Sequence, residues 1–337
     1  MGHDKSNHLR RLDRRSVLRS VAGAGIAGVT ASLAGCLGGE DEDVITKGTT
    51  EGGTTGLLTE TLMDEGFDED HGIQIQSEAF AAPPQVQQQL VLNEDIPAAY
   101  MGSIVATRNW EDNQIELVGP YMNYHAYIVT REDSDIEEPQ DLEGMELSWA
   151  SREADAWLKV AVILAQEYGL EPDDYELSEV APATSIGLLE DEDLDAILLH
   201  EPLITNALVE HDFEIVLDPE ETWEEMTGLP MTTVDVAWEQ SWYESNEEDA
   251  EAFAAAVYDT QNYIEDNFDD VIDTYADAIG LEGDEQIELA KERLPGTYPT
   301  EWSDDLAESG LEFVEQAHDL GILEVEPTDD IYNVIDV

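Results

Sequence analysis

The sequence predicts a two-lobed α/β protein. From residue 44 to residue 217, short apolar runs typical of buried strands alternate with helical stretches, which indicates parallel sheets covered by helices. Without the first 35 residues about 300 remain, more than one hydrophobic core usually supports. Hydrophobic residues make up 42% of the chain, so it can build such cores although its charged residues are mostly acidic.

The N-terminal segment has the pattern of an export signal. Arg14 and Arg15 precede an uncharged apolar run from Val21 to Leu33, as in twin-arginine signals. This run is shorter than the roughly 20 residues that a membrane-spanning helix needs. We therefore expect residues 1–35 to be removed on export by the twin-arginine pathway.

A lipid-attachment site is expected directly after this run. The sequence Leu33-Ala34-Gly35-Cys36 resembles the lipobox of lipoproteins, and Cys36 is the only cysteine of the chain. A lone cysteine can also be a small buried hydrophobic residue, but acidic residues follow this one closely. We expect a lipid on Cys36, an acidic tether over residues 36–43, and a protein anchored to the extracellular face of the cell membrane.

The charge of the chain is strongly negative. The first 35 residues carry six of the 13 basic residues and two of the 80 acidic ones, which leaves seven basic and 78 acidic residues and a formal charge of −71. At molar salt the screening length falls to about 3 Å, so the repulsion between these acids is largely removed. The composition indicates a halophile, and it excludes nucleic acid as a partner because phosphate neutralisation needs clustered Lys and Arg.

The expected elements follow one another in a regular order. A turn-rich loop, Thr49 to Thr55, separates the first strand from a helix with an apolar face, and Pro84 can begin the next helix. Ser151 occupies the N-cap position expected for a helix over 154–168. From Ser245, which forms a capping box with Glu248, three or four helices run to residue 320. Strands are expected at 44–47, 73–80, 97–101, 115–118, 124–130, 146–149, 175–180, 196–199 and 213–217.

Several short motifs mark the ends of these segments: Glu65-Gly66-Phe67, His71-Gly72-Ile73, Asp95-Ile96-Pro97-Ala98-Ala99-Tyr100 before Gly102-Ser103, Asp141-Leu142-Glu143-Gly144 before Trp149-Ala150-Ser151, Leu194-Asp195-Ala196-Ile197 before Glu201-Pro202, and Gly321-Ile322-Leu323. Singly each motif is weak, but their order resembles that of the periplasmic binding proteins for alkanesulfonate, taurine, nitrate and thiamine-pyrimidine precursors. The resemblance covers about Val44 to Asn333.

This resemblance implies a periplasmic binding protein fold of type II with C-terminal helices. One lobe would contain residues 44–122 and 217–337, the other residues 123–216, and the ligand would lie in the cleft between them. The resemblance also implies a monomer without cofactor that delivers a small molecule to an ABC permease. The ligand would be a small polar organic molecule or oxyanion, such as a sulfonate, nitrate or a pyrimidine.

Loops that follow strands and begin helices are the expected ligand contacts, because helix N-termini offer free N–H groups there. In the first such loop we expect Thr50, Thr54 and Thr55 to contact ligand, although the same residues could simply permit a surface turn. Gly102 and Ser103 form the second loop.

The third loop holds Ser151 and Arg152. Ser151 could cap its helix, contact ligand, or both. Arg152 could pair with an anion of the ligand or with a nearby acid, and the residues leave both alternatives open.

Further candidates lie at strand ends. His200 and Glu201 are expected to contact the ligand or the hinge, and a metal site is not expected because no second ligand stands at metal-binding spacing. Thr232 could line the return crossing. Rings at strand ends could stack on a planar ligand but are more often core residues: Phe80, Tyr121 and Tyr124.

These features predict a binding protein without turnover. One alternative is an enzyme on the same fold, as in relatives of pyrimidine or menaquinone biosynthesis, because a fold alone does not fix function. The export signal and the lack of a G-x-S-x-G motif argue against that alternative. Another alternative is a sensory or adhesive lipoprotein that works without an importer.

Overall fold

The computed structural model describes residues 44–93, 95–281, 283–335 and 337. The expected export signal, the lipid site at Cys36 and the tether lie outside the described residues. Within them, two five-stranded sheets carry the fold, and no helix is long and apolar enough to cross a bilayer.

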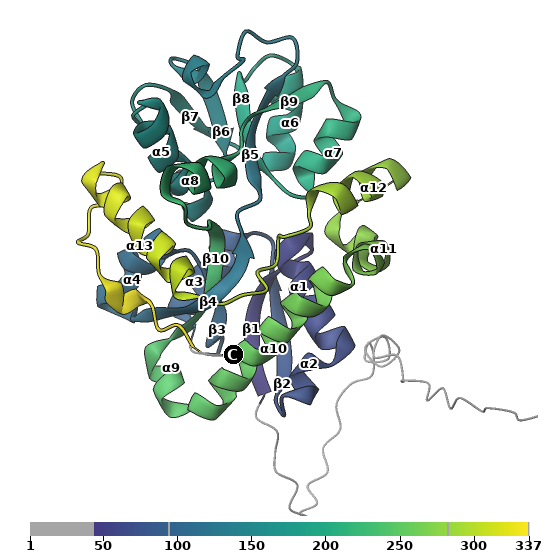
Figure 1. The fold of residues 1–337 in the computed structure, drawn as a ribbon, viewed down its shortest axis with the longest axis vertical. Helices are drawn as coiled ribbons and strands as arrows, with labels where there is room; N and C mark the ends of the chain where they lie inside the picture. The colour runs from purple at the N-terminus through teal and green to yellow at the C-terminus, as the bar shows by residue number, and fades with distance from the viewer. Residues whose placement is uncertain (1–43, 94, 282, 336) are drawn as a thin grey trace, which may run out of the picture. The chain divides into compact units, whose positions relative to one another are not determined.

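Sheet A has the strand order β2-β1-β3-β10-β4 (Figure 1). Strands β1, β2 and β3 run parallel, whereas β10 is antiparallel to both of its neighbours. The sheet is therefore mixed, not purely parallel as the alternating pattern predicts. Its strands are β1 (Val44–Thr50), β2 (Gln74–Phe80), β3 (Ala98–Met101), β4 (Ile115–Asn123) and β10 (Thr232–Glu239).

Helices cover both faces of sheet A because side chains alternate along its strands. On β1 the buried Lys47 contacts Thr59 of α1, whereas a Cβ on the adjacent Gly48 would lie 3.1 Å from a side-chain atom of Val86 on α3. The crossover helices are α1 (Gly53–Glu65), α2 (Phe67–Asp70), α3 (Pro83–Leu92) and α4 (Ser103–Asn113).

Sheet B has the order β7-β6-β8-β5-β9 and is also mixed, since β5 is antiparallel to β8 and β9. The chain passes from sheet A to sheet B between β4 and β5, and returns between β9 and β10. The elements here are β5 (Ala126–Arg131), η3 (Pro139–Leu142), β6 (Glu146–Trp149), α5 (Asp155–Tyr168), β7 (Glu176–Glu179), α6 (Pro182–Glu190), β8 (Ala196–His200), α7 (Leu203–Glu210) and β9 (Phe213–Leu217).

The later helices pack against helices that follow strands of both sheets. Helices α10 and α11 contact α1, α12 contacts α7, and α13 contacts α4 and α5, as can be followed in Figure 1. These elements are α8 (Pro219–Thr227), α9 (Gln240–Ser245), α10 (Glu247–Asp266), α11 (Phe268–Ile279), α12 (Asp284–Arg293), α13 (Asp304–Asp319) and η4 (Asp329–Ile331).

Three local expectations are wrong. Strand β1 continues past Lys47 to Thr50, so the loop before α1 is shorter than expected. Strand β10 was not expected; its buried Asp235 interrupts the apolar pattern. Helix α10 is preceded by Asn246, and the Ser245 hydroxyl donates to a carbonyl of the preceding helix instead of forming a capping box.

Candidate ligand-binding site

The predicted contacts of sheet A gather at the carboxyl ends of its parallel strands. Thr50 ends β1 and lies in register with Phe80, which ends β2. Gly102 and Ser103 follow β3 and begin α4. This is the edge at which open α/β sheets bind ligands.

The first turn of α1 is tied to the crossing between the sheets. The Thr54 hydroxyl lies 3.1 Å from Nε2 of His125, and the Tyr298 hydroxyl donates to the Thr54 carbonyl at 2.8 Å. The other ring nitrogen of His125 lies 2.9 Å from the carbonyl of Asn123. Burial lowers the pKa of His125 to about 4, so the ring is neutral at pH 7. The predicted residue Thr54 therefore links α1 to the β4–β5 crossing.

A buried lysine lies beneath this loop. The Lys47 ammonium donates to the Thr59 hydroxyl at 2.8 Å and to the Tyr121 hydroxyl at 3.1 Å. Tyr121 in turn donates to the carbonyl of Thr55, whose hydroxyl bonds to that of Thr50. Burial lowers the pKa of Lys47 to about 7. The predicted residues Thr50, Thr55 and Tyr121 are thus parts of one hydroxyl network above a lysine.

The start of α4 is occupied by a carboxylate of the chain itself. Oδ1 of Asp155, the first residue of α5, accepts hydrogen bonds from the amides of Ile104 at 3.0 Å and Val105 at 3.4 Å. Gly102 permits this approach, since a Cβ there would lie 2.3 Å from Cγ of Asp155. The other carboxylate oxygen of Asp155 and the hydroxyl of Ser103 are buried without a partner among the described residues.

Sheet B contributes two aromatic side chains from neighbouring strand ends. Trp149 ends β6 and His200 ends β8, and their rings meet edge to face with centroids 5.8 Å apart. Nε1 of Trp149 and Nδ1 of His200 are both buried without a partner among the described residues. Burial lowers the pKa of His200, which keeps the ring neutral at pH 7.

Glu201 forms a buried ion pair instead of standing free. Its Oε1 accepts from Nε of Arg293 at 2.8 Å and its Oε2 accepts from the Thr205 hydroxyl at 2.6 Å. Burial raises the pKa of Glu201, and the Arg293 guanidinium opposes that rise. Glu201 therefore connects α7 to the end of α12.

The third predicted loop is arranged differently from the expectation. Helix α5 begins at Asp155 after Ala154, and the Ser151 hydroxyl accepts from the amide of Glu153 within a turn, so Ser151 is not the N-cap. The Arg152 guanidinium donates to the carbonyl of Leu177 at 3.1 Å and lies 3.9 Å from Glu179. Arg152 therefore lies beside an acid of this chain, Glu179.

Three other predicted residues bond to or pack against other parts of the protein. The Tyr124 hydroxyl donates to the carbonyl of Ala156 at 2.7 Å and its ring is buried. Thr232 is buried at the start of β10, where its carbonyl accepts from the Lys159 ammonium at 2.7 Å. Phe80 is half-buried and packs against the core.

Comparison with known proteins places this arrangement in a family. The model of the NMT1-like family matches residues 61–279, more than half of the chain. The chain belongs to the NMT1-like family. None of the curated proteins matches it.

Solved structures share the fold of this NMT1-like protein. The alkanesulfonate-binding protein SsuA from Xanthomonas axonopodis pv. citri, bound to MOPS, has a TM-score of 0.68 at 14% identity, with 86% of this chain and 96% of that chain covered. The ligand-binding component of an ABC-type import system from Staphylococcus aureus has a TM-score of 0.67 at 11% identity, covering 87% and 97%. The periplasmic aliphatic sulphonate-binding protein SsuA from Escherichia coli has a TM-score of 0.66 at 16% identity, covering 86% and 90%. The chain has the periplasmic binding protein fold.

One groove in this NMT1-like protein borders the predicted residues. It has a volume of about 360 Å³ and lies between helices α3 and α4 of sheet A and the segment Ser151–Ala154 that follows β6 of sheet B. At its rim, Arg108 on α4 pairs with Glu153 at 2.7 Å. The groove therefore lies where elements of the two sheets meet.

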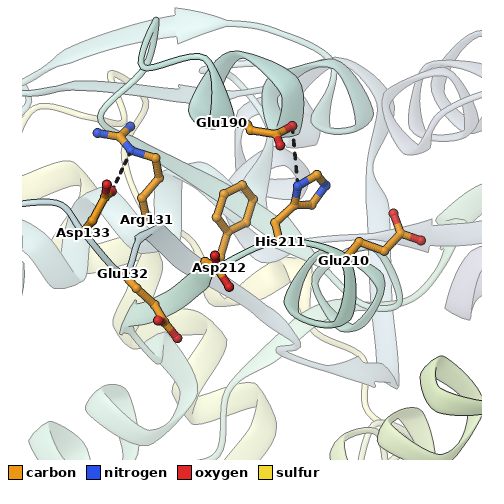
Figure 2. Close-up of a pocket in the computed structure, with 8 residues that line it drawn as sticks. Arg131, Glu132, Asp133, Glu190, Glu210, His211 and Asp212 are labelled. Carbon is orange, nitrogen blue, oxygen red and sulfur yellow. Dashed lines mark hydrogen bonds and ion pairs between the residues drawn. The ribbon is translucent and has the colours of Figure 1, made fainter.

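A second hollow, of about 430 Å³, lies at the opposite edge of sheet B, where β5 ends and β9 begins (Figure 2). Figure 2 shows Arg131 turned toward Asp133 and His211 turned toward Glu190, at 3.3 Å and 3.5 Å. Arg131 and His211 thus each lie beside an acid, and this hollow is remote from His200 because β5 and β8 are antiparallel. Among the described residues no group of His, Cys, Asp and Glu could hold a metal ion.

Sequence reasoning missed five residues of this region: Lys47, His125, Asp155, Arg293 and Tyr298. Their partners are distant in sequence, as for Thr54 and Tyr298, which lie 244 positions apart. A usable signal existed for Lys47 and Arg293, because each is one of only seven basic residues after residue 35.

Proposed function

We propose that this protein is the extracellular solute-binding component of an ABC importer and captures a small polar organic or oxyanion ligand between its two sheets. In this proposal residues 44–122 and 217–337 form one lobe and residues 123–216 the other. Ligand enters the open form, the lobes close by hinge motion, and the closed form docks on the permease. The protein works as a monomer and catalyses no reaction.

The observation that carries this proposal is a set of buried polar groups, near the strand ends of both sheets, that have no hydrogen-bond partner among the described residues. Sheet A presents the hydroxyls of Tyr100 and Ser103, and sheet B presents ring nitrogens of Trp149 and His200. Buried polar atoms almost always have hydrogen-bond partners, and a missing partner costs about 1–3 kcal/mol. A polar ligand between the sheets would supply these partners, which favours binding as the reason for their retention.

The structural relatives support a ligand of this class. Two of them bind sulfonates and one is the ligand-binding component of an importer. A sulfonate or nitrate would use helix N-termini and hydroxyl donors, whereas a pyrimidine would also stack on rings such as Trp149. The candidate site favours a ligand with few charges, because Arg152 and Arg293 are already paired with acids.

A screen for bound ligands tests the proposal. Purified protein without residues 1–35 is heated at high salt with alkanesulfonates, nitrate, carboxylates and pyrimidines, because a ligand raises the melting temperature by mass action. At least one class should stabilise the wild type, and Thr54→Val should reduce that stabilisation. Phe213→Leu, in the hollow beside Arg131 and His211, serves as the control and should leave it unchanged. Stabilisation by none of these classes would contradict the proposal.

The same proposal includes export by the twin-arginine pathway and a lipid on Cys36, supported by the sequence motifs at those positions. It also includes a halophilic source, supported by the excess of acidic residues. Mass spectrometry of the native protein from membranes should find Cys36 as the lipid-modified first residue. Cys36→Ala should release the protein from the membrane, and recovery of uncleaved protein in the cytosol would contradict this part.

A further inference from the structure

The basic residues of the mature chain fall into two groups. Five of the seven form ion pairs with acids: Arg108, Arg131, Arg152, Lys291 and Arg293. Lys47 and Lys159 are fully buried, and neither has a carboxylate within ion-pair distance in the described part of the chain. A buried lysine without a paired carboxylate is unexpected in a chain with 78 acidic residues, because buried charges are normally paired. Such a lysine is expected if its charge interacts with another partner.

Lys159 has a partner of its own, since its ammonium donates to the carbonyl of Thr232 and the carboxylates of Asp155 and Asp235 raise its pKa against the effect of burial. Lys47 donates only to hydroxyls and to the carbonyl of Gly48 among the described residues. Its ammonium also lies 4.8 Å from the ring centroid of Tyr121 and 5.8 Å from that of Tyr100. Rings and hydroxyls stabilise a cation but do not neutralise it.

The first turn of α1, in front of Lys47, is suited to an anion. Gly52 precedes this 13-residue helix and provides no side-chain cap, and the first turn contains no acidic residue. Gly52, Gly53 and Thr55 are partly exposed, so the turn can be reached from outside. Glu51, the nearest acid in sequence, is exposed to solvent.

An unsatisfied hydroxyl points to a ligand at the same place. The buried Tyr100 hydroxyl lies near the hydroxyls of Thr55 and Thr50, which lower its pKa against the larger rise caused by burial. It nevertheless has no well-aligned hydrogen-bond partner in the described structure. A ligand oxygen at the first turn of α1 would supply that partner.

The first turn of α4 is closed to an anion. Asp155 already accepts from the amides of Ile104 and Val105, and its second oxygen is buried beside them. A ligand anion at this turn would meet a carboxylate at close range, which is unfavourable in a buried environment. The two helix starts at this edge of sheet A therefore differ in their capacity for negative charge.

On the basis of the binding function proposed above, we propose that the ligand carries a single anionic group, which binds at the first turn of α1 in front of Lys47, and that Asp155 excludes a second anionic group at α4. Lys47 acts as a positioning charge, because the Thr59 and Tyr121 hydroxyls lie between it and the loop. Binding takes up a proton from solvent onto Lys47.

This proton uptake follows from the surroundings of Lys47. Burial alone lowers its pKa to about 7, so near that pH part of the free protein has a neutral amine. The titratable groups that face it are the phenols of Tyr100 on β3 and Tyr121 on β4. Helix α1 presents the Thr59 hydroxyl to Lys47. Helix α10 contributes the neutral amide of Gln261, which donates to the backbone carbonyl of Tyr121. The pKa values of both phenols are raised by burial. An anion at α1 favours the protonated lysine.

Three probes of similar shape test the proposal: methanesulfonate with one charge, dimethyl sulfone with none, and methanedisulfonate with two. Their affinities are measured by calorimetry near pH 7 at constant high salt in two buffers of different ionisation enthalpy, with uracil as a neutral pyrimidine reference. Methanesulfonate should bind at least about tenfold more tightly than dimethyl sulfone. Its binding should take up a fraction of a proton, and methanedisulfonate should bind no better than methanesulfonate.

Two variants separate the roles of the residues. Lys47→Met should bring methanesulfonate close to dimethyl sulfone in affinity and abolish proton uptake, whereas Lys291→Met, on α12, should change neither. Asp155→Asn should improve binding of methanedisulfonate relative to methanesulfonate. If a variant fails to fold, the proton uptake measured with the wild-type protein still tests the proposal.

The outcomes distinguish this inference from the proposed function. If uracil or dimethyl sulfone binds but methanesulfonate binds no better or without proton uptake, the single-anion inference is wrong and the binding function stands. If none of the four compounds binds, the inference is wrong, and the broader ligand screen decides on the function.

Discussion

Asp155 on α5 accepts a hydrogen bond 3.0 Å long from the backbone amide of Ile104, in the first turn of α4. Asp155 begins α5, which follows strand β6 of sheet B. Its carboxylate satisfies free amides in the first turn of α4, which follows strand β3 of sheet A. With the contact of Arg108 and Glu153 it forms a polar connection between elements of the two sheets.

This contact predicts the effect of adding one methyl group. In Gly102→Ala the new Cβ would lie 2.3 Å from Cγ of Asp155 and displace the carboxylate. The variant should lose about 1–3 kcal/mol of unfolding free energy, because the α4 amides and the buried carboxylate lose their partners. Denaturant titration measures the loss. Gly187→Ala, where a Cβ would meet no atom within 4 Å, is the matched control and should not lose stability.

The double variant Gly102→Ala with Asp155→Ala checks the mechanism. The stability losses caused by substitutions of contacting residues are not additive, so the double variant should be about as stable as Asp155→Ala alone. Additive losses would show that Gly102 acts through something other than Asp155.

His125 predicts a loss of stability in acid. Its pKa is about 4 in the folded protein against 6.5 in the unfolded chain, so between these values the unfolded chain binds more protons. Unfolding free energy should therefore fall as the pH drops from 6.5 to 4, with a contribution of at most about 1.4 kcal/mol per pH unit from this residue. His125→Asn should show a shallower decline over that range. An unchanged decline would assign the acid sensitivity to other groups.

Arg152 predicts a contrast between two substitutions. Because its guanidinium contacts Leu177 and Glu179 at the surface, Arg152→Ala should change ligand affinity by less than about twofold. His200→Ala removes a buried nitrogen that has no hydrogen-bond partner among the described residues, and it should weaken binding by about tenfold. Equilibrium titration of both variants with the same ligand decides. A larger effect at Arg152 would restore it as a ligand contact.

The charge of the mature chain predicts a strong dependence on salt. At 0.15 M salt the screening length is about 8 Å and at 1 M about 3 Å, so repulsion among the acids persists at the lower concentration. The melting temperature should rise steeply with KCl. Replacing the exposed acids of the loop 191–193 by their amides should flatten this rise, and an equally steep rise in the variant would assign it to salt effects other than charge screening.

Much of the site's location could be predicted because it depends on local sequence. Phe80, Gly102 and His200 each stand at or directly after the end of an expected strand, and each lies at or directly after a carboxyl strand end in the structure. The order of strands and helices follows from periodicity, and periodicity is a property of neighbouring residues.

The electrostatics of the site could not be predicted in this way. Lys47 looks like the polar end of a short strand, yet it lies inside a strand that continues to Thr50 and contacts Tyr121, 74 positions away. Asp155 looks like an acid in the first turn of its own helix, but its partners are amides 51 and 50 positions earlier. Which helix start accepts an anion is therefore decided by tertiary contacts.

A crystal structure with the ligand that stabilises the protein most strongly tests the central claim directly. The account predicts electron density between the two sheets, within hydrogen-bonding distance of the first turn of α1 and of Nδ1 of His200. Density in the hollow beside Arg131 and His211, with the region around Thr54 and His200 unchanged, would contradict it.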